Sequence, residues 1–152
     1  MSGVHAGGHM ELLLVEDNAA DVRLVREGLS VFASKYHLTV VSDGEAAIDY
    51  LKRRGKYSAA ARPSLVLLDL NLPKKDGLEV LREMKGDPNL KKIPVMVLTS
   101  SNSERDVTAA YELGANSYVR KAGTLDEIYG IMRSIYDFWV CRVVLPDFDQ
   151  TE

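Results

Sequence analysis

Short apolar runs alternate with segments of helical periodicity along this chain, and that alternation limits the fold more than any other feature. Three runs contain apolar residues only, at residues 12–15, 65–68 and 95–98. Strands that are buried on both faces have this composition, as in the centre of a parallel sheet. Two shorter and more mixed runs, at residues 38–41 and 118–119, are typical of edge strands. The sequence therefore predicts five strands.

The segments between the runs predict helices. Apolar residues recur there every three or four positions, which is the period of a helix that packs on one face. A polar residue able to cap a helix N-terminus precedes each segment. These candidate caps are Asn18, Asp43, Asp76, Ser103 and Thr124.

Five strand–helix repeats imply a parallel sheet with helices on both faces. We expect an α/β fold of the flavodoxin-like type, a doubly wound five-stranded sheet of order 2-1-3-4-5 with five helices. Residues 10–145 would form this domain. Residues 1–9 are Gly-rich and without hydrophobic period, so they predict a disordered or non-native tail, and residues 146–152 predict a second tail.

Composition narrows the class of protein. The 152 residues carry a formal net charge of −3, which gives no electrostatic reason to expect nucleic-acid binding. No apolar run approaches the roughly 20 residues of a membrane span. A single cysteine, Cys141, excludes an internal disulfide and a Cys-rich metal site. We therefore expect a cytoplasmic protein with no membrane or nucleic-acid partner.

Polar residues end the predicted strands, and strands of this fold present their carboxyl ends at one edge. Glu16 and Asp17 follow the first run, Asp69 the third, Thr99 the fourth, and Lys121 stands just after the fifth. Packed carboxylates repel one another unless a cation such as Mg²⁺ neutralises them. Because a carboxylate can accept a phosphoryl group, Asp69 is the expected nucleophile, with Glu16 and Asp17 as metal ligands.

Four motifs in this order carry a family resemblance. They are VEDN at residues 15–18, DLNLPKKDG at 69–77, LTS at 98–100 and YVRK at 118–121. Together they resemble the receiver domain of bacterial two-component response regulators, over residues 10 to about 138. The resemblance implies phosphorylation of Asp69 and a Mg²⁺ ion held by Glu16 (partly through water), Asp17, Asp69 and the backbone carbonyl of Asn71.

The resemblance also implies a switch. Lys121 would contact the phosphoryl group, and Thr99 would move toward it, which lets Tyr118 turn inward. One departure concerns the residue after the lysine, because most receivers have a proline there, usually after a cis peptide bond, and this chain has Ala122. The departure leaves open a displaced Lys121 and a degenerate receiver that acts only through protein contacts.

Further phrases look like the single-domain regulators paired with bacterial phytochromes. These phrases are VEDN at residues 15–18, DLNLPKK at 69–75, LGANSY at 113–118 and FWV at 138–140. This narrower likeness implies a histidine kinase as partner, with a light-sensing bacterial phytochrome as the candidate. The chain would then be no enzyme in the ordinary sense, since it would process only its own phosphoryl group. A small Mg²⁺-dependent phosphatase and a flavin carrier of the same fold remain as rivals.

The last predicted helix carries more apolar residues than one packed face requires. Beside its main stripe runs a second one, formed by Tyr129, Tyr136, Val140 and Val143. Exposed apolar patches mark interfaces, so this stripe and the tail after it predict a homodimer. The alternative is that the stripe packs within the chain.

Overall fold

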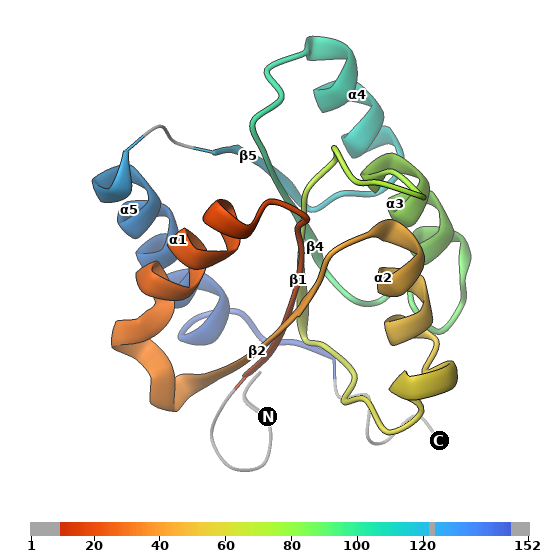
Figure 1. The fold of residues 1–152 in the computed structure, drawn as a ribbon, viewed down its shortest axis with the longest axis horizontal. Helices are drawn as coiled ribbons and strands as arrows, with labels where there is room; N and C mark the ends of the chain where they lie inside the picture. The colour runs from red at the N-terminus through yellow and green to blue at the C-terminus, as the bar shows by residue number, and fades with distance from the viewer. Residues whose placement is uncertain (1–9, 122–123, 147–152) are drawn as a thin grey trace.

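A single parallel sheet forms the centre of the molecule in the computed structural model, which describes residues 10–121 and 124–146. The predicted tail 1–9 and residues 147–152 of the second tail lie outside these ranges. The strand order is β2-β1-β3-β4-β5, which confirms the predicted fold (Figure 1). The strands are β1 (Met10–Val15), β2 (Tyr36–Val41), β3 (Leu65–Leu68), β4 (Val95–Thr99) and β5 (Ser117–Arg120).

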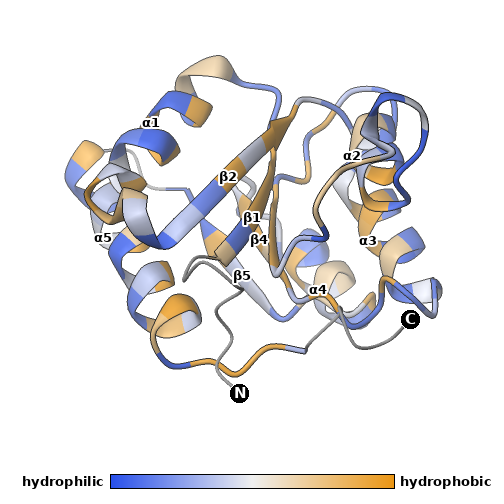
Figure 2. Cartoon of the chain, turned by 90° about the horizontal axis from the view of Figure 1, so that it is seen from below, coloured by the Kyte–Doolittle hydropathy of each residue, from blue (hydrophilic) through white to orange (hydrophobic). Residues whose placement is uncertain are grey.

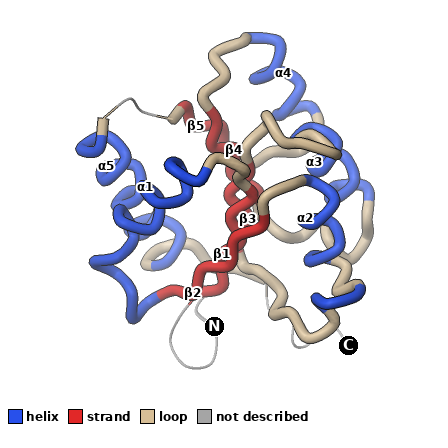
Figure 3. The backbone as a smooth tube through the Cα atoms, viewed as in Figure 1, coloured by secondary structure: helices blue, strands red, loops and turns tan. Residues whose placement is uncertain are grey.

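Helices cover both faces of this sheet, α1 and α5 on one and α2, α3 and α4 on the other (Figures 1 and 3). Each of the five begins directly after its predicted cap, whose side chain accepts a backbone N–H of the first turn. Asp76 and Glu79 form a reciprocal capping box. The helices are α1 (Ala19–Leu29), α2 (Gly44–Leu51), α3 (Gly77–Gly86), α4 (Glu104–Glu112) and α5 (Leu125–Ile135).

The core lies in two layers, one on each face of the sheet. Nearly every residue of β1, β3 and β4 is buried, as their unbroken apolar runs predict, whereas β2 and β5 are half-buried edge strands. Figure 2 shows the same contrast in hydropathy between the central strands and the edges. Burial on both faces makes the central strands a rigid support for the polar residues that follow them.

Two segments differ from the helical pattern in the sequence. The first helix ends at Leu29, and Phe32, which continues its apolar spacing, lies instead in a 3₁₀ segment, Ser30–Lys35. A π-helix, Tyr136–Val140, follows α5. The rings of Phe32 and Tyr136 stack with centroids 3.9 Å apart, so the two irregular segments pack on each other.

No helix within the described ranges is long and apolar enough to span a membrane.

Candidate functional site

The strand ends bring the predicted polar residues to one edge of the sheet. Backbone hydrogen bonds fix their positions: the Asp69 N–H donates to the Val15 carbonyl at 3.0 Å, and the Lys121 N–H donates to the Thr99 carbonyl at 2.8 Å. Glu16 follows Val15 directly and donates its own N–H to the Val41 carbonyl at 3.0 Å. These side chains are therefore held by the rigid centre of the sheet, next to one another.

Three carboxylates form a cluster that suits a hard cation. Glu16, Asp17 and Asp69 each place a carboxylate oxygen within 4.8 Å of the other two. Glu16 and Asp69 are buried, with 3% and 5% of their surface exposed, and Asp17 is exposed. All three donors are oxygens and one is open to solvent, which suits Mg²⁺ because that ion keeps several of its waters. The residues present thus fit the metal that the sequence predicts.

Lys121 lies inside this cluster. Its Nζ donates to Asp69 Oδ2 at 3.1 Å and to Asp21 Oδ2 at 2.8 Å, and it pairs with Glu16 Oε1 at 2.5 Å. The lysine side chain is only 10% exposed. The displaced lysine considered from the sequence is thus not found, although Ala122, which prompted that alternative, lies outside the described residues.

The pKa values of the two buried carboxylates are shifted in opposite directions by burial and by neighbouring groups. Burial, together with hydrogen bonding to Asp69, raises the pKa of Glu16 to about 7. Burial also acts to raise the pKa of Asp69, but hydrogen bonds from Thr99 and Glu16 and the charge of Lys121 outweigh it, so the pKa of Asp69 lies below its usual value. Asp69 is therefore ionised at neutral pH, which is the state a nucleophile requires.

Thr99 and Tyr118 lie in the places from which the predicted switch would act. Thr99 is fully buried, its hydroxyl oxygen accepts the Ser101 N–H at 3.4 Å, and it helps to lower the pKa of Asp69. Tyr118 is half-buried, and its hydroxyl donates to the Ser101 carbonyl at 3.1 Å. The hydroxyl groups of Thr99 and Tyr118 thus both contact Ser101, in the segment that follows β4.

The loop after β3 shapes the mouth of the site. The Asn71 N–H donates to Asp69 Oδ1 at 3.2 Å, and the Gly77 N–H donates to the Leu70 carbonyl at 2.9 Å. A Cβ at Gly77 would lie 2.3 Å from the Asp69 carbonyl oxygen. The start of α3 therefore approaches this strand end so closely that only glycine fits at position 77. Beside the loop is a cavity of about 440 Å³, lined in part by Asp17, Asn71 and Asp106.

Sequence reasoning missed one participant. Asp21 lies in the first turn of α1, three residues after the predicted Asn18 cap, where the sequence pattern assigns it no contact outside the helix. Its carboxylate, however, bonds to Lys121, which is 100 residues away in the chain. The sequence does show a carboxylate four positions after Asp17, at the start of a helix that begins beside the site. Its partner could be identified only from the folded structure.

The second stripe of the last helix is divided between surface and core. Tyr129 is 40% exposed, whereas Tyr136 stacks on Phe32, and Val140 and Val143 pack against the core layer beneath α1 and α5. Exposed apolar surface comes from other residues near the same end, above all Phe138 at 57% and Val144 at 74%.

Comparison with known proteins agrees with this geometry. Residues 12–133 match the model of the response regulator receiver domain. Response regulator Rcp1 of Synechocystis sp. is 49% identical over 135 residues, which are 89% of this chain and 92% of that protein. The crystal structure of the Mn²⁺-bound form of Rcp1 matches with a TM-score of 0.86 at 48% identity, covering 91% of this chain and 99% of that one.

A phosphorylated relative is also similar. The crystal structure of the phosphorylated cyanobacterial phytochrome response regulator RcpA matches with a TM-score of 0.88 at 46% identity. It covers 91% of this chain and 99% of the RcpA chain. With a matching family model over most of its length and relatives of this identity, the chain belongs to the response regulator receiver domain family.

Proposed function

We propose that this chain is a single-domain response regulator that accepts a phosphoryl group from a histidine kinase onto Asp69 in a Mg²⁺-dependent reaction. The observation that carries the proposal is the placement of an ionised, buried Asp69 beside the Lys121 ammonium, 3.1 Å away, and within a cluster of three carboxylates. The state of Asp69 then controls contacts with other proteins.

The residues divide the chemistry between them. An oxygen of Asp69 attacks phosphorus, an acyl phosphate bond forms, and the bond from phosphorus to the donor breaks, with its electron pair leaving on the donor. Lys121 stabilises negative charge on the phosphoryl oxygens, and the Thr99 hydroxyl donates a hydrogen bond to one of them. Glu16, Asp17, Asp69 and the Asn71 carbonyl would hold Mg²⁺, which would neutralise part of the charge on the phosphoryl group.

The proposed phosphoryl donor is a phytochrome-type histidine kinase in the cytoplasm. RcpA is described as a cyanobacterial phytochrome response regulator, and another similar structure is that of the bacteriophytochrome response regulator RtBRR, at 39% identity and a TM-score of 0.73. A kinase that pairs with such regulators is the partner this likeness favours.

The direct test is the intact mass of the protein after incubation with Mg²⁺ and acetyl phosphate. We expect one added phosphoryl group, absent without Mg²⁺ and absent in Asp69→Asn, which keeps the shape of the side chain and removes the nucleophile. If no adduct forms, binding of beryllium fluoride separates rapid hydrolysis from a degenerate receiver. Failure of both would overturn the proposal and favour an interaction module that works without phosphate.

The metal assignment has its own test. Asp17→Asn removes one ligand charge from the exposed side of the cluster without disturbing the buried residues, so Mg²⁺ affinity should fall by about tenfold or more. Asp126→Asn, at an exposed carboxylate in the first turn of α5, is the matched control. Equal Mg²⁺ affinity of Asp17→Asn and wild type, measured by calorimetry, would refute the role of Asp17.

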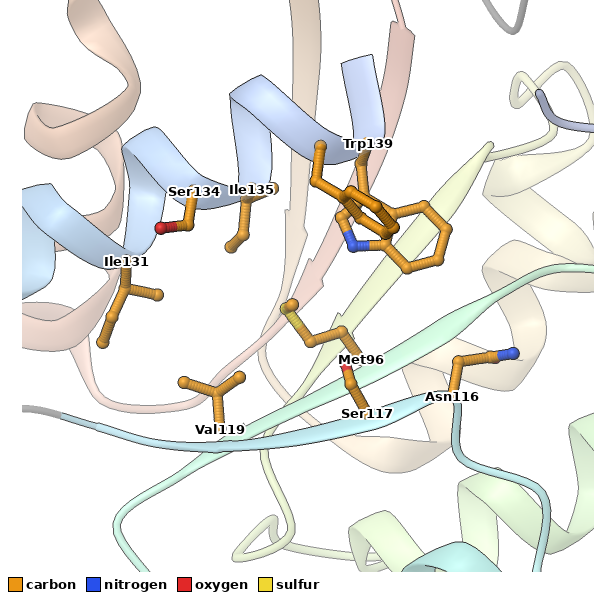
Figure 4. A pocket seen from close by; sticks show the side chains of 9 residues that line it. Met96, Asn116, Ser117, Val119, Ile131, Ser134, Ile135 and Trp139 are labelled. Carbon is orange, nitrogen blue, oxygen red and sulfur yellow. The ribbon is translucent and has the colours of Figure 1, made fainter. Parts of the chain in front are cut away.

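We further propose that the protein forms a homodimer through α5 and the segment after it. A pocket of about 460 Å³ between β5 and α5 supports this, and the exposed Phe138 is one of the residues that line it. Figure 4 shows Ile131 and Ile135 pointing from α5 toward Met96 and Val119 on the strands. The hydroxyl of Ser117, another residue that lines the pocket, is buried without a hydrogen-bond partner among the described residues.

A further inference from the structure

The Lys121 ammonium has a carboxylate partner for each of its three N–H groups. The partners come from three different elements: Glu16 follows β1, Asp69 follows β3, and Asp21 lies in the first turn of α1. A lysine ammonium has three donors and no acceptor, so this arrangement satisfies it completely. The side chain is 10% exposed, so water competes little for these three contacts.

The three partners differ in what else they must do. Glu16 and Asp69 belong to the carboxylate cluster, so a bound cation draws on their oxygens, and Asp69 loses its carboxylate charge when it becomes an acyl phosphate. Asp21 is outside that cluster. It is therefore the one anionic partner of Lys121 whose charge is unchanged when the metal binds and when the phosphoryl group is attached.

The local structure holds Asp21 in place. Asn18 caps α1, and its Oδ1 accepts the N–H of Ala20 at 2.9 Å and that of Asp21 at 3.1 Å. The cap fixes the turn, and a carboxylate is favoured at a helix N-terminus by the helix dipole. The dipole alone would account for a solvated Asp, but here the carboxylate is 31% exposed and aimed at a buried ammonium 2.8 Å away.

We propose that Asp21 is a positioning residue that anchors Lys121 beside Asp69 throughout the phosphorylation cycle. The inference rests on the proposed function, because it concerns the lysine that would bind the phosphoryl group. Asp21 touches neither the phosphoryl group nor the metal; it acts by keeping the ammonium in reach of Asp69 when a dication in the same cluster repels it.

The test is a double-mutant cycle on the rate constant of phosphorylation by acetyl phosphate at saturating Mg²⁺. Asp21→Asn should lower that constant roughly three- to tenfold, as expected for loss of one partly exposed charged hydrogen bond. Asp21→Glu keeps the charge and should recover the rate to within about twofold of wild type. In a Lys121→Ala background, Asp21→Asn should change the residual rate by less than about twofold, since the group it anchors is gone.

The controls separate anchoring from other effects. Glu27→Gln removes one exposed carboxylate from the same helix and should leave the rate constant unchanged. Equal losses from Asp21→Asn with and without Lys121 would overturn the proposal, because the residue would then act through net charge or the fold. A wild-type rate in Asp21→Asn would overturn it too.

A second measurement does not depend on phosphorylation. Hydrogen exchange at the Lys121 ammonium, followed by nitrogen NMR and identified by its loss in Lys121→Ala, should be slow in the wild-type protein and faster in Asp21→Asn. If wild-type protein takes up no phosphate, the proposed function fails while this exchange still decides the anchor. An unchanged exchange rate in Asp21→Asn would overturn the anchoring role.

Discussion

Glu16 is the side chain through which pH should act on the site. Burial raises its pKa to about 7, so in the absence of a cation it is half protonated near neutral pH. A cation bound through this carboxylate must displace the proton, so binding releases protons. Mg²⁺ affinity should therefore be nearly constant above pH 7 and fall by up to about tenfold per pH unit below it. Calorimetry in buffers of different ionisation enthalpy measures both the affinity and the proton release.

Glu16→Gln provides the control for this pH dependence. The amide does not titrate near neutral pH, so Mg²⁺ should bind more weakly but with a flat profile between about pH 6 and about pH 8. Lys121 stays charged over that range, because its carboxylate partners outweigh burial and hold its pKa above the ordinary value. A wild-type affinity that does not change with pH would contradict the assignment.

At this residue scale, the sequence predicts part of the site and misses part. Glu16, Asp17 and Asp69 could be placed together because strand ends of a parallel sheet meet at one edge, whatever the details of packing. The contact of Lys121 with Asp21 could not, because it depends on a side-chain conformation and on two elements 100 residues apart. Local rules explain Asp21 equally well as a helix-start residue.

Among the elements, the start of α3 is the one most tightly coupled to the site. A Cβ at Gly77 would lie 2.3 Å from the Asp69 carbonyl oxygen and 2.5 Å from the Leu70 Cα, and both are backbone atoms that cannot turn aside. Gly77→Ala should therefore lower the free energy of unfolding by about 1–3 kcal/mol and slow phosphorylation of Asp69, because the strand end must shift. Urea unfolding and the acetyl phosphate reaction measure the two effects.

Gly86→Ala is the matched control for this prediction. Gly86 ends the same helix and has nothing within 4 Å of the position of a Cβ. Since alanine favours the helix, the variant should be as stable as wild type or up to about 1 kcal/mol more stable, with an unchanged reaction rate. If both variants behaved alike, the close approach at Gly77 would not constrain the site.

The elements also show which parts of the secondary structure can be predicted from sequence patterns and which cannot. Unbroken apolar runs identified β1, β3 and β4 because these strands are buried on both faces, and cap residues located all five helix starts. The 3₁₀ segment Ser30–Lys35 and the π-helix Tyr136–Val140 escaped, because Phe32 and Tyr136 keep helical spacing while the stacking of their rings is a tertiary contact.

For the whole molecule, assembly is the property to test. Tyr129→Asp and Phe138→Asp each place a charge on the exposed part of the proposed interface, so each should convert a dimer to a monomer in light scattering. Ala59→Asp places the same charge at an exposed site beyond α2, among the helices on the other face of the sheet, and should leave the mass unchanged. Val140 and Val143 are unsuitable here because they pack against the core, and charging them would test folding instead.

Two outcomes would contradict the proposed dimer. A wild-type mass equal to one chain would exclude it at the concentration measured. A dimer that survives both substitutions would move the interface elsewhere on the surface. The pocket between β5 and α5 would then need another occupant.

The position of the lone tryptophan gives the C-terminal segment an optical signal of its own. Trp139 is the single tryptophan of the chain, and it lies half-buried in the π-helix with its ring centroid 5.7 Å from that of Phe138. The wavelength of indole emission depends on the polarity around the ring, so movement or covering of this segment shifts the wavelength of the intrinsic fluorescence. The unlabelled protein can therefore report on its own C-terminal segment in real time, while the proposed phosphorylation is followed at the opposite end of the strands.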